Sequence, residues 1–446
     1  MAALLSAGCS SSFLDQDPPL YIGEEDIYIS AERMEATLLG LYGSLKNTEE
    51  ESFMGGKTYL VFDQRGEDIS NVSGNLSTLY TMNVSPVSTE NTTTWTNAYA
   101  TINNINLFLE GIEGGKEVLG DKYAQFKAEA QFIRALCYYY LNNLYAQPYL
   151  LKPDAKSVPL RLTAQKGGEG NAMPRSTVEQ VYNQVLADLQ DLQALPDGTA
   201  TEAGTTRATK GAAHMLKMRV TMALGNWEAA IKEGEAVKGY ELVSDVTTLF
   251  KTPYYTTETI FSLPMATNNT PNTQQGLAEY YTDPKILKID LENGIMAEAN
   301  YSLADDKRMS FKTEDETLAK FTDVRTKLDW VPIFRYAETL LNLAECYANT
   351  SDGEAQAKDY LKQVRHRSLA ADKDKLNIDA LSGDALKQAI YKERRLEFIG
   401  EGLRGIDILR RGENFVRGKK VTSPQSSGYI WPIPQAESLL NPDINK

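Results

Sequence analysis

The sequence predicts a mainly α-helical protein in which antiparallel helix pairs stack and support long polar loops. Apolar residues recur at spacings of three and four over long stretches, which indicates amphipathic helices. Short turn signals separate several neighbouring helices. Two long segments between the helical regions are instead rich in Asn, Ser, Thr and Tyr. With 446 residues, the chain can bury one large core or about two to three ordinary ones.

Three segments have the clearest helical periodicity. Residues 122–145 carry apolar side chains at alternating spacings of four and three, and residues 333–348 repeat that rhythm. Residues 178–195 form a third predicted helix, which Ser176 or Thr177 would cap and the following proline would end.

Two further segments are predicted to form helix pairs. Residues 208–237 are interrupted by Gly225-Asn226, and residues 335–367 by a turn at 351–353. A helix, a short turn, and then aromatic and small residues at helical spacing resemble a tetratricopeptide unit. We therefore expect stacked antiparallel pairs, although unrelated helical hairpins would give the same kind of scaffold.

The helical scaffold is expected over residues of about 95–250 and 333–410, and the loop-rich regions over about 49–94 and 268–330. Both loop-rich regions are too long to be simple connections, and long loops on a rigid scaffold usually have a function. These two regions are therefore the predicted binding regions.

The charge balance argues against several classes of partner. The chain has 46 Lys and Arg against 60 Asp and Glu, which gives a net charge of −14. Such a surface repels nucleic-acid phosphates and anionic lipid head groups. Anionic polysaccharides are also disfavoured, unless a local basic pocket overrides the global charge.

No catalytic, cofactor or metal motif is predicted. The only histidines are His214 and His366, too few for a histidine-based zinc site. Cys137 and Cys346 lie in helical apolar patterns and are expected to be buried and unreactive. Residues 400–405 spell G-x-G-x-x-G, but they follow a helical run, whereas a dinucleotide-binding turn follows a strand. We expect a binding protein without cofactor or metal rather than an enzyme.

The first residues resemble the end of a bacterial lipoprotein signal. Residues 1–9 are apolar and then small, ending at Cys9, which would be the acylated cysteine. The match to a lipobox is imperfect, because Leu5 lies one place early and Ser6 occupies its position. We interpret residues 1–9 as a truncated signal segment and residues 10–446 as a single domain.

Blocks of sequence resemble the SusD/RagB family in the family's own order over nearly the whole chain. They are Phe13-Leu14-Asp15 after the cysteine; Trp95, Tyr99, Ile102 and Asn106; residues 128–145 with Pro159-Leu160; residues 175–196; residues 334–345; residues 364–367; residues 393–404; and Trp431-Pro432-Ile433-Pro434 with Asn441-Pro442. The sequence departs from the pattern at Gln131, where the family usually has Arg, and at Ala146-Gln147, where it has Gly-Asp.

The resemblance implies a SusD-like fold and a function. Members are surface-exposed lipoproteins of Bacteroidetes that capture nutrients, usually glycans, for a TonB-dependent outer-membrane transporter. It therefore implies a non-catalytic, lipid-anchored outer-membrane protein that delivers oligosaccharide to a SusC-like partner. Peptide capture of the RagB kind and a tetratricopeptide scaffold that binds only proteins are the alternatives.

A sugar site needs flat aromatic rings beside polar groups, and the two loop-rich regions contain both. In the family, ligands lie on the face that these two regions build. The predicted ligand-binding residues are Asp68, Asn75, Tyr80, Tyr280, Tyr281 and Tyr301. Trp95 is assigned to the core, and Trp330 fits the core and the binding face equally well.

Three arginines in the family blocks are predicted to be structural. Arg134, Arg335 and Arg394 lie at helical spacing from carboxylates and would hold helix pairs together by bidentate bonds. The nearby carboxylates are Glu129, Glu338 and Glu393.

Overall fold

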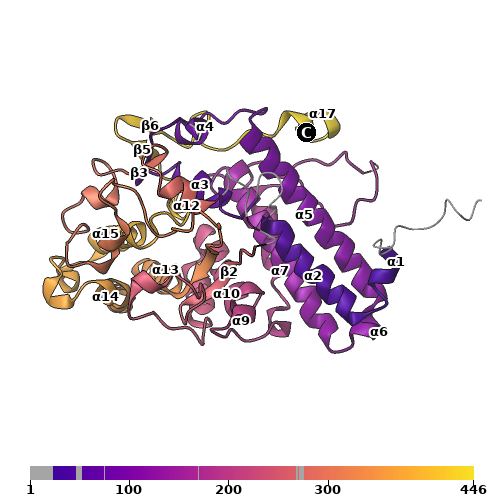
Figure 1. Ribbon diagram of the computed structural model, residues 1–446. Helices are drawn as coiled ribbons and strands as arrows, with labels where there is room; N and C mark the ends of the chain where they lie inside the picture. The colour runs from indigo at the N-terminus through magenta and orange to yellow at the C-terminus, as the bar shows by residue number, and fades with distance from the viewer. Residues whose placement is uncertain (1–23, 47–52, 75, 169, 268–269, 271–275) are drawn as a thin grey trace, which may run out of the picture.

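The computed structural model describes residues 24–46, 53–74, 76–168, 170–267, 270 and 276–446. Helices dominate this part of the chain (Figure 1). The helices are α1 (Glu24–Ile27), α2 (Ala31–Lys46), α3 (Lys57–Asp63), α4 (Ser77–Tyr80), α5 (Thr89–Gly114), α6 (Lys116–Leu119), α7 (Lys122–Tyr145), α8 (Val178–Asp188), α9 (Glu202–Thr206), α10 (Lys210–Ala223), α11 (Trp227–Glu235), α12 (Leu277–Tyr281), α13 (Tyr336–Ala348), α14 (Glu354–Ser368), α15 (Gly383–Glu397), α16 (Arg404–Arg410) and α17 (Gln435–Leu440). The strands are β1 (Ile69–Asn71), β2 (Thr259–Leu263), β3 (Leu287–Ile289), β4 (Val331–Arg335), β5 (Phe415–Arg417) and β6 (Lys420–Thr422).

The long helices pack one after another along the chain. Helix α5 packs on α7, α7 on α8, α8 on α10, and α10 on α11. The array continues through α13, which contacts α11, α14 and α15. This succession of neighbouring helix pairs confirms the predicted mainly helical, stacked fold.

Local signals set most of the helix boundaries. Helix α7 has the predicted bounds, and the turn between α10 and α11 is made by Gly225, at φ 72°, and Asn226. The Asn226 side chain accepts a hydrogen bond from the Ala229 N–H at 3.2 Å and caps α11. Helix α8 begins with a capping box, in which Thr177 and Gln180 each accept the other's backbone N–H. The hairpin of α13 and α14, with its turn near residues 351–353, is also as predicted.

Two predicted helices are shorter than expected. Helix α8 ends at Asp188 rather than near residue 195, and residues 192–194 form a separate 3-10 turn. Residues 333–335 belong to strand β4 and not to a helix, since β4 pairs with β2 in antiparallel register from Leu263↔Val331 to Thr259↔Arg335. An apolar run of this length fits a strand as well as a helix, and the pairing with β2 decides between them.

The two loop-rich regions lie side by side and contain regular structure. Strand β1 comes from the first region and β3 from the second, and they pair from Ile69↔Ile289 to Asn71↔Leu287. Residues 53–65 are buried throughout, and α3 lies within them. Residues 53–65 therefore belong to the core, although the sequence predicted them to lie in a loop-rich binding region.

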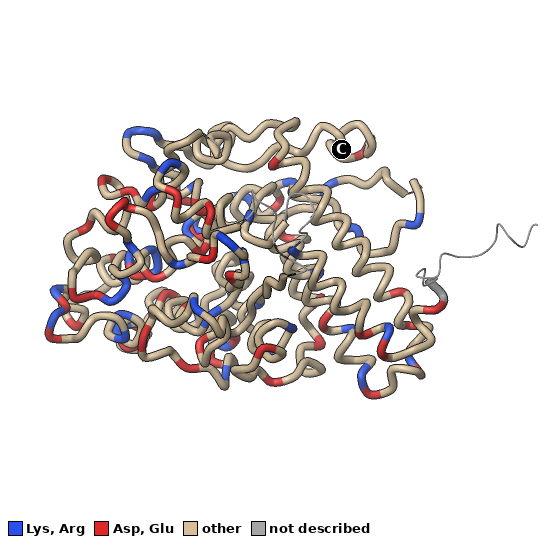
Figure 2. The backbone as a smooth tube through the Cα atoms, viewed as in Figure 1, with Lys and Arg blue, Asp and Glu red and all other residues tan. Residues whose placement is uncertain are grey.

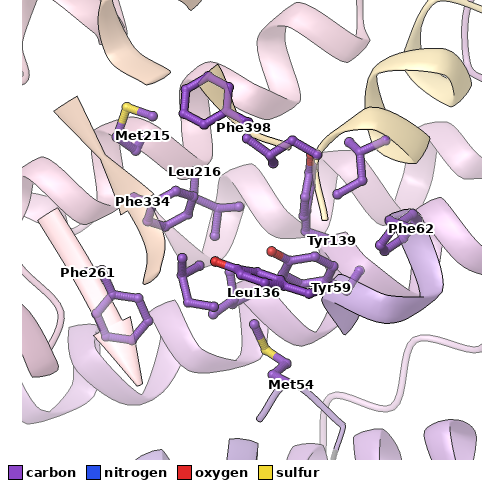
Figure 3. Close-up of a cluster of buried hydrophobic side chains, with 14 of the residues drawn as sticks. Met54, Tyr59, Phe62, Leu136, Tyr139, Met215, Leu216, Phe261, Phe334 and Phe398 are labelled. Carbon is purple, nitrogen blue, oxygen red and sulfur yellow. The ribbon is translucent and has the colours of Figure 1, made fainter. Parts of the chain in front are cut away.

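The core is formed where helices α3, α7 and α10 meet the β2–β4 pair (Figure 3). Figure 3 labels Tyr59 and Phe62 from α3, Tyr139 from α7, Phe261 from β2 and Phe334 from β4, all buried. Trp95 of α5 is also buried, as predicted. Burial of such large side chains is the main favourable contribution to folding.

The three arginines are structural, as predicted, but each pairs with carboxylates outside its own helix or strand. Arg134 forms a bidentate pair with Asp188, at 2.6 and 2.9 Å. Arg394 pairs with Asp407 in the same way, at 3.0 and 3.1 Å. Arg335 of β4 binds Glu258, Glu397 and Glu401 at 2.7–2.9 Å.

The carboxylates predicted to pair with these arginines bind other cations. Glu129 accepts from Arg207, and Glu338 from Arg219. Glu393 lies between Arg308 and Arg365. Figure 2 shows this interleaving of basic and acidic residues across the half of the molecule that contains α13–α15. The charge pairs of these three glutamates therefore join different segments of the chain rather than successive turns of one helix.

The cysteines and the glycine-rich segment agree with the sequence predictions where the structure describes them. Cys137 and Cys346 are buried free thiols, as predicted, and burial raises the pKa of each. Residues 400–405 follow the end of α15, with Gly400 and Gly402 at positive φ, as expected for a turn after a helix. Cys9 lies outside the described residues. No helix among the described residues is long and apolar enough to cross a membrane.

Candidate functional site

Tyr281 and Tyr301 do not offer their rings to a ligand. The Tyr281 side chain is buried, its ring packs against Phe321, and its hydroxyl donates to the Asp63 carboxylate. Tyr301 is buried beneath the Arg365 guanidinium, whose central carbon lies 5.0 Å from the ring centre. Both rings therefore serve packing, and the expectation that they form sugar platforms is corrected.

Asp68 is also buried, and its carboxylate joins three segments. It accepts from Arg395 Nη2 at 2.6 Å and from the Ile295 N–H at 2.7 Å. These bonds hold the first loop-rich region against the second and against α15. Since its oxygens are already occupied, Asp68 is a structural group rather than the predicted polar rim of a site.

The other predicted residues retain partial exposure or are not described. Asn75 lies outside the described residues. Tyr280, on α12, is partly exposed. Tyr80, at the end of α4, is partly exposed, and the Arg417 guanidinium covers one face of its ring at 3.7 Å from the centre.

The structure instead gathers three partly exposed rings that the sequence did not single out together. Trp330 lies 6.0 Å from Tyr254 and 6.0 Å from Tyr255, measured between ring centres, with interplanar angles of 27° and 37°. We call Tyr254, Tyr255 and Trp330 the aromatic triad. Tyr254 is stacked on Trp330 and Tyr255 is tilted against it, and three such partly exposed rings offer a surface on which the apolar C–H faces of sugars can stack.

The alternation of strand β4 explains why Trp330 faces outward. Val331 and Ile333 are buried, whereas Pro332 is partly exposed. Side chains of a strand alternate between its two faces, so Trp330 falls on the same side as Pro332 and Phe334. This side is partly exposed where the strand begins, at Pro332, and buried further along, at Phe334. The strand thus positions the tryptophan at the edge of the core without burying it.

A tight turn before β4 fixes the position of the triad. The Asp323 carboxylate accepts from the backbone N–H groups of Thr326 at 2.8 Å and Leu328 at 3.0 Å. Asp329 in turn accepts from the Asp323 N–H at 2.8 Å and from the Tyr254 hydroxyl at 3.2 Å. These bonds couple the turn to the segment of the two tyrosines.

The charges beside the triad are mostly acidic. Burial raises the pKa of Asp329. For Asp323, burial acts to raise the pKa, but the hydrogen bonds from Thr326 and the backbone lower it overall. Lys327 pairs with Glu279 at 3.1 Å, next to Tyr280 on α12. The oxygens of Asp323 and Asp329 already accept hydrogen bonds within the protein, so these carboxylates position the triad rather than form the polar rim of a site.

The cavities near these residues are small. The hollow lined by Gly276, Lys327 and Asp329 has a volume of about 10 Å³, enough for about one water molecule. A ligand on the triad would therefore lie across the surface rather than in a deep pocket.

A larger cavity lies elsewhere, between α5 and α17, with a volume of about 160 Å³. Its polar lining is occupied by bonds within the protein, since Asn103 bonds the Gln165 backbone at 2.7 and 3.1 Å and Asn106 donates to the Arg161 carbonyl. Among the described residues, no cluster of three His, Cys, Asp or Glu side chains is placed to hold a metal ion.

Comparison with known proteins agrees with this architecture. A family model described as "Starch-binding associating with outer membrane" matches residues 12–222, and the SusD family model matches residues 265–446. A SusD superfamily protein from Bacteroides fragilis, known from a crystal structure, has 59% sequence identity to this chain. The match covers 94% of this chain and 100% of the Bacteroides fragilis chain, with a TM-score of 0.93. The chain belongs to the SusD superfamily.

More distant SusD-like proteins cover the chain almost completely. SusD-like protein P25 of Formosa agariphila is 24% identical, over 92% of this chain and 88% of its own. Surface glycan-binding protein A of Bacteroides thetaiotaomicron, solved in complex with laminarihexaose, has a TM-score of 0.73 at 19% identity and covers 92% of this chain and 97% of its own. The latter likeness shows the shared SusD-like fold.

Proposed function

We propose that this SusD-like protein captures an oligosaccharide at the cell surface and passes it to a SusC-like TonB-dependent transporter, without catalysing a reaction. The observation that supports this most directly is the aromatic triad, because three partly exposed rings in one place are an arrangement that suits sugar stacking. The glycan complex of a protein with the same fold supports the same ligand class.

Trp330 is the proposed central platform, with Tyr254 and Tyr255 extending it. Tyr280 is retained as a proposed contact, because the Lys327–Glu279 ion pair holds its helix beside the turn that precedes Trp330. The hydrogen-bonded turn fixes the rings before binding, which lowers the entropy that binding would otherwise cost.

The proposed location is the outer membrane, with a lipid anchor at Cys9. Two or more acyl chains would hold the protein stably at a bilayer. The anchor leaves the folded part free to meet a transporter. Co-purification of a large β-barrel protein from membranes in mild detergent would support the proposed transporter partner, and its absence from such extracts would contradict it.

The binding test is calorimetry on residues 10–446 with laminarihexaose and a panel of neutral and acidic polysaccharides. Trp330→Ala and Tyr255→Ala should each weaken binding of the preferred glycan by about 1–3 kcal/mol, by analogy with bases stacking on aromatic side chains, which is about 5- to 150-fold in Kd. Thermal unfolding of each variant checks that the fold is intact.

Tyr360→Ala is the matched control. Tyr360 and Tyr347 form another partly exposed stacked pair, 5.9 Å apart with 24° between the rings, on α14 and α13. Loss of affinity in the triad variants alone would support the assignment. If Trp330→Ala and wild type bound the glycan with equal affinity, the binding site would lie elsewhere than at the triad. Absence of any glycan binding would overturn the proposal and favour peptide capture or a protein-only scaffold.

A further inference from the structure

Two arginines, Arg65 and Arg417, lie within and beside the first loop-rich region. Arg65, which follows α3, is buried at 2% exposure, and Arg417, at the end of β5, is partly exposed. Within the part of the chain that is described, neither arginine forms an ion pair. Burial lowers the pKa of Arg65 to about 10 and also lowers that of Arg417. A buried guanidinium without a counter-ion is costly.

The other buried arginines of the protein show how unusual this is. Each has a carboxylate oxygen within 2.5–3.0 Å; they are Arg134, Arg219, Arg308, Arg335, Arg365, Arg394 and Arg410. The chain has more acidic than basic residues, so a shortage of carboxylates does not explain why none pairs with Arg65 among the described residues. The lack of a carboxylate partner among the described residues therefore distinguishes Arg65 from the other buried arginines.

The two arginines belong to one local cluster. Arg65 stacks over the ring of Phe415, 4.7 Å from its centre, and donates to the Tyr429 carbonyl. Arg417, two residues after Phe415 on the same strand, donates to the carbonyls of Gln64 and Gly66, the two neighbours of Arg65. The β5–β6 hairpin thus places both guanidinium groups beside the end of α3.

Several polar atoms in the cluster have no hydrogen-bond partner within the described residues. They are Nη1 of Arg65, Nε of Arg417, and both side-chain amide atoms of Gln64. Gln64 is fully buried. Buried polar groups in folded proteins are almost always bonded, so four unsatisfied atoms together make this cluster unusually polar for the interior.

The exposed side of the cluster is basic and has an aromatic ring. Beyond Arg417, the hairpin continues with the exposed Lys419 and with Lys420, whose ammonium group donates to the Thr81 carbonyl at 2.6 Å. Figure 2 shows Lys and Arg gathered at this hairpin, at the upper left, where Figure 1 labels β5 and β6. Tyr80 lies directly under the Arg417 guanidinium.

We propose that Arg417, Lys419 and Tyr80 form a subsite for a negatively charged substituent, a carboxylate or a sulfate, on a bound saccharide. Arg65 lies beneath them and adds positive charge from within the protein. A guanidinium group binds carboxylates and sulfates through charge-assisted hydrogen bonds, and the tyrosine ring supports the sugar that bears the anion. This inference rests on the proposed glycan-binding function and names the ligand class as acidic saccharides.

The nearby carboxylates do not fill this role. Glu67 and Asp290 lie close enough to raise the pKa of Arg417, but neither forms an ion pair with it among the described residues. The Glu67 carboxylate is already held by Arg404 at 2.7 Å and Arg395 at 3.2 Å. The positive charge of Arg417 and Lys419 is therefore available to an external anion, although the whole protein is acidic.

The test is calorimetry on residues 10–446 with three probes: tetragalacturonate, a sulfated chondroitin tetrasaccharide and the neutral laminarihexaose. One of the acidic probes should bind more tightly than the neutral one. Its affinity should decrease when the NaCl concentration is raised from about 0.02 M to about 0.3 M, since salt screens exposed charges. Arg417→Gln should weaken the acidic probe by about tenfold or more. Lys419→Glu should weaken it severalfold, and neither variant should change the neutral probe.

Arg33→Gln is the matched control, because Arg33 is an exposed arginine of α2. Lys419 is exposed, so its replacement tests the subsite even if Arg417→Gln fails to fold. The inference is overturned if neither acidic probe binds more tightly than laminarihexaose, or if both hairpin variants match Arg33→Gln. Neutral glycan binding that depends on Trp330 would in that case leave the proposed function intact, whereas absence of binding by every glycan would overturn both.

Discussion

Asp63→Asn is predicted to remove a pH dependence of stability that a buried carboxyl group creates. Burial raises the pKa of Asp63 from 3.8 to about 7, even though the Tyr281 hydroxyl and the Gly402 N–H both donate to this carboxyl. The folded protein therefore holds this proton more tightly than the unfolded chain. Between about pH 4 and about pH 7 the folded state binds more protons, so the free energy of unfolding falls as pH rises through that interval.

The size of the effect follows from the shift in pKa. A rise of about three units at 1.36 kcal/mol per unit corresponds to about 4 kcal/mol of stability lost from this group between about pH 4 and about pH 7. Asn has the same shape, its oxygen can still accept from the Gly402 N–H, and the Tyr281 hydroxyl can rotate to accept from its amide. The variant should therefore gain stability relative to wild type as pH rises.

Urea unfolding of wild type and Asp63→Asn, at steps from about pH 4 to about pH 8, measures this difference directly. Asp305→Asn controls for the chemical change itself, since Asp305 is exposed. Parallel stability curves for wild type and Asp63→Asn would refute the reasoning. So would a wild-type protein that gains stability relative to the variant as pH rises.

Two further substitutions test the buried charge network and the turn after α15, both by urea unfolding. Glu397→Gln should lower the free energy of unfolding by about 3–5 kcal/mol, because Glu397 compensates Arg335, at 2.7 Å, and Arg367 inside the protein. Gly402→Ala should lower it by at least about 1–3 kcal/mol, because Gly402 has φ 70° and an added Cβ would lie 2.7 Å from the Tyr59 Cα.

Each of these variants has a matched control. Glu298→Gln removes a carboxylate from a partly exposed pair with Lys392, and such pairs contribute only about 0–1 kcal/mol. Gly43→Ala adds a methyl group within α2, where nothing lies within 4 Å of it, and should leave stability equal or raise it by about 0.5–1 kcal/mol. Similar losses for Glu397→Gln and Glu298→Gln would contradict the importance of the network. A Gly402→Ala protein as stable as Gly43→Ala would contradict the strain at the turn.

The helical scaffold could be predicted because its signals are local. Helix α7 and the turn at Gly225-Asn226 are encoded by residues within a few positions of each other, which sequence periodicity detects. The structural arginines were also identified, but their partners were not. Arg134 and Asp188 lie 54 positions apart, and no pattern within one helix reveals that pairing.

The binding residues were harder to predict because burial of a tyrosine depends on distant partners. Tyr281 bonds Asp63, 218 positions away, and Asp68 bonds Arg395, 327 positions away. A polar segment with scattered tyrosines has the same composition whether its rings face solvent or the core. Composition therefore located the two regions that lie together but could not separate a stacking ring from a packed one.

The sequence left open whether Trp330 lies in the core or on the binding face, and it wrongly assigned residues 333–335 to a helix. Both outcomes have the same cause. When residues 333–335 are treated as helix, Trp330 precedes a helix and its direction is undetermined. When Val331–Arg335 is treated as a strand, alternation places Trp330 opposite the buried Val331 and Ile333, on the side that is partly exposed at Pro332. The missing information was the pairing with β2, and the segment that leads into β2 contains Tyr254 and Tyr255. The strand pair that corrects the fold is thus the same feature that assembles the aromatic triad.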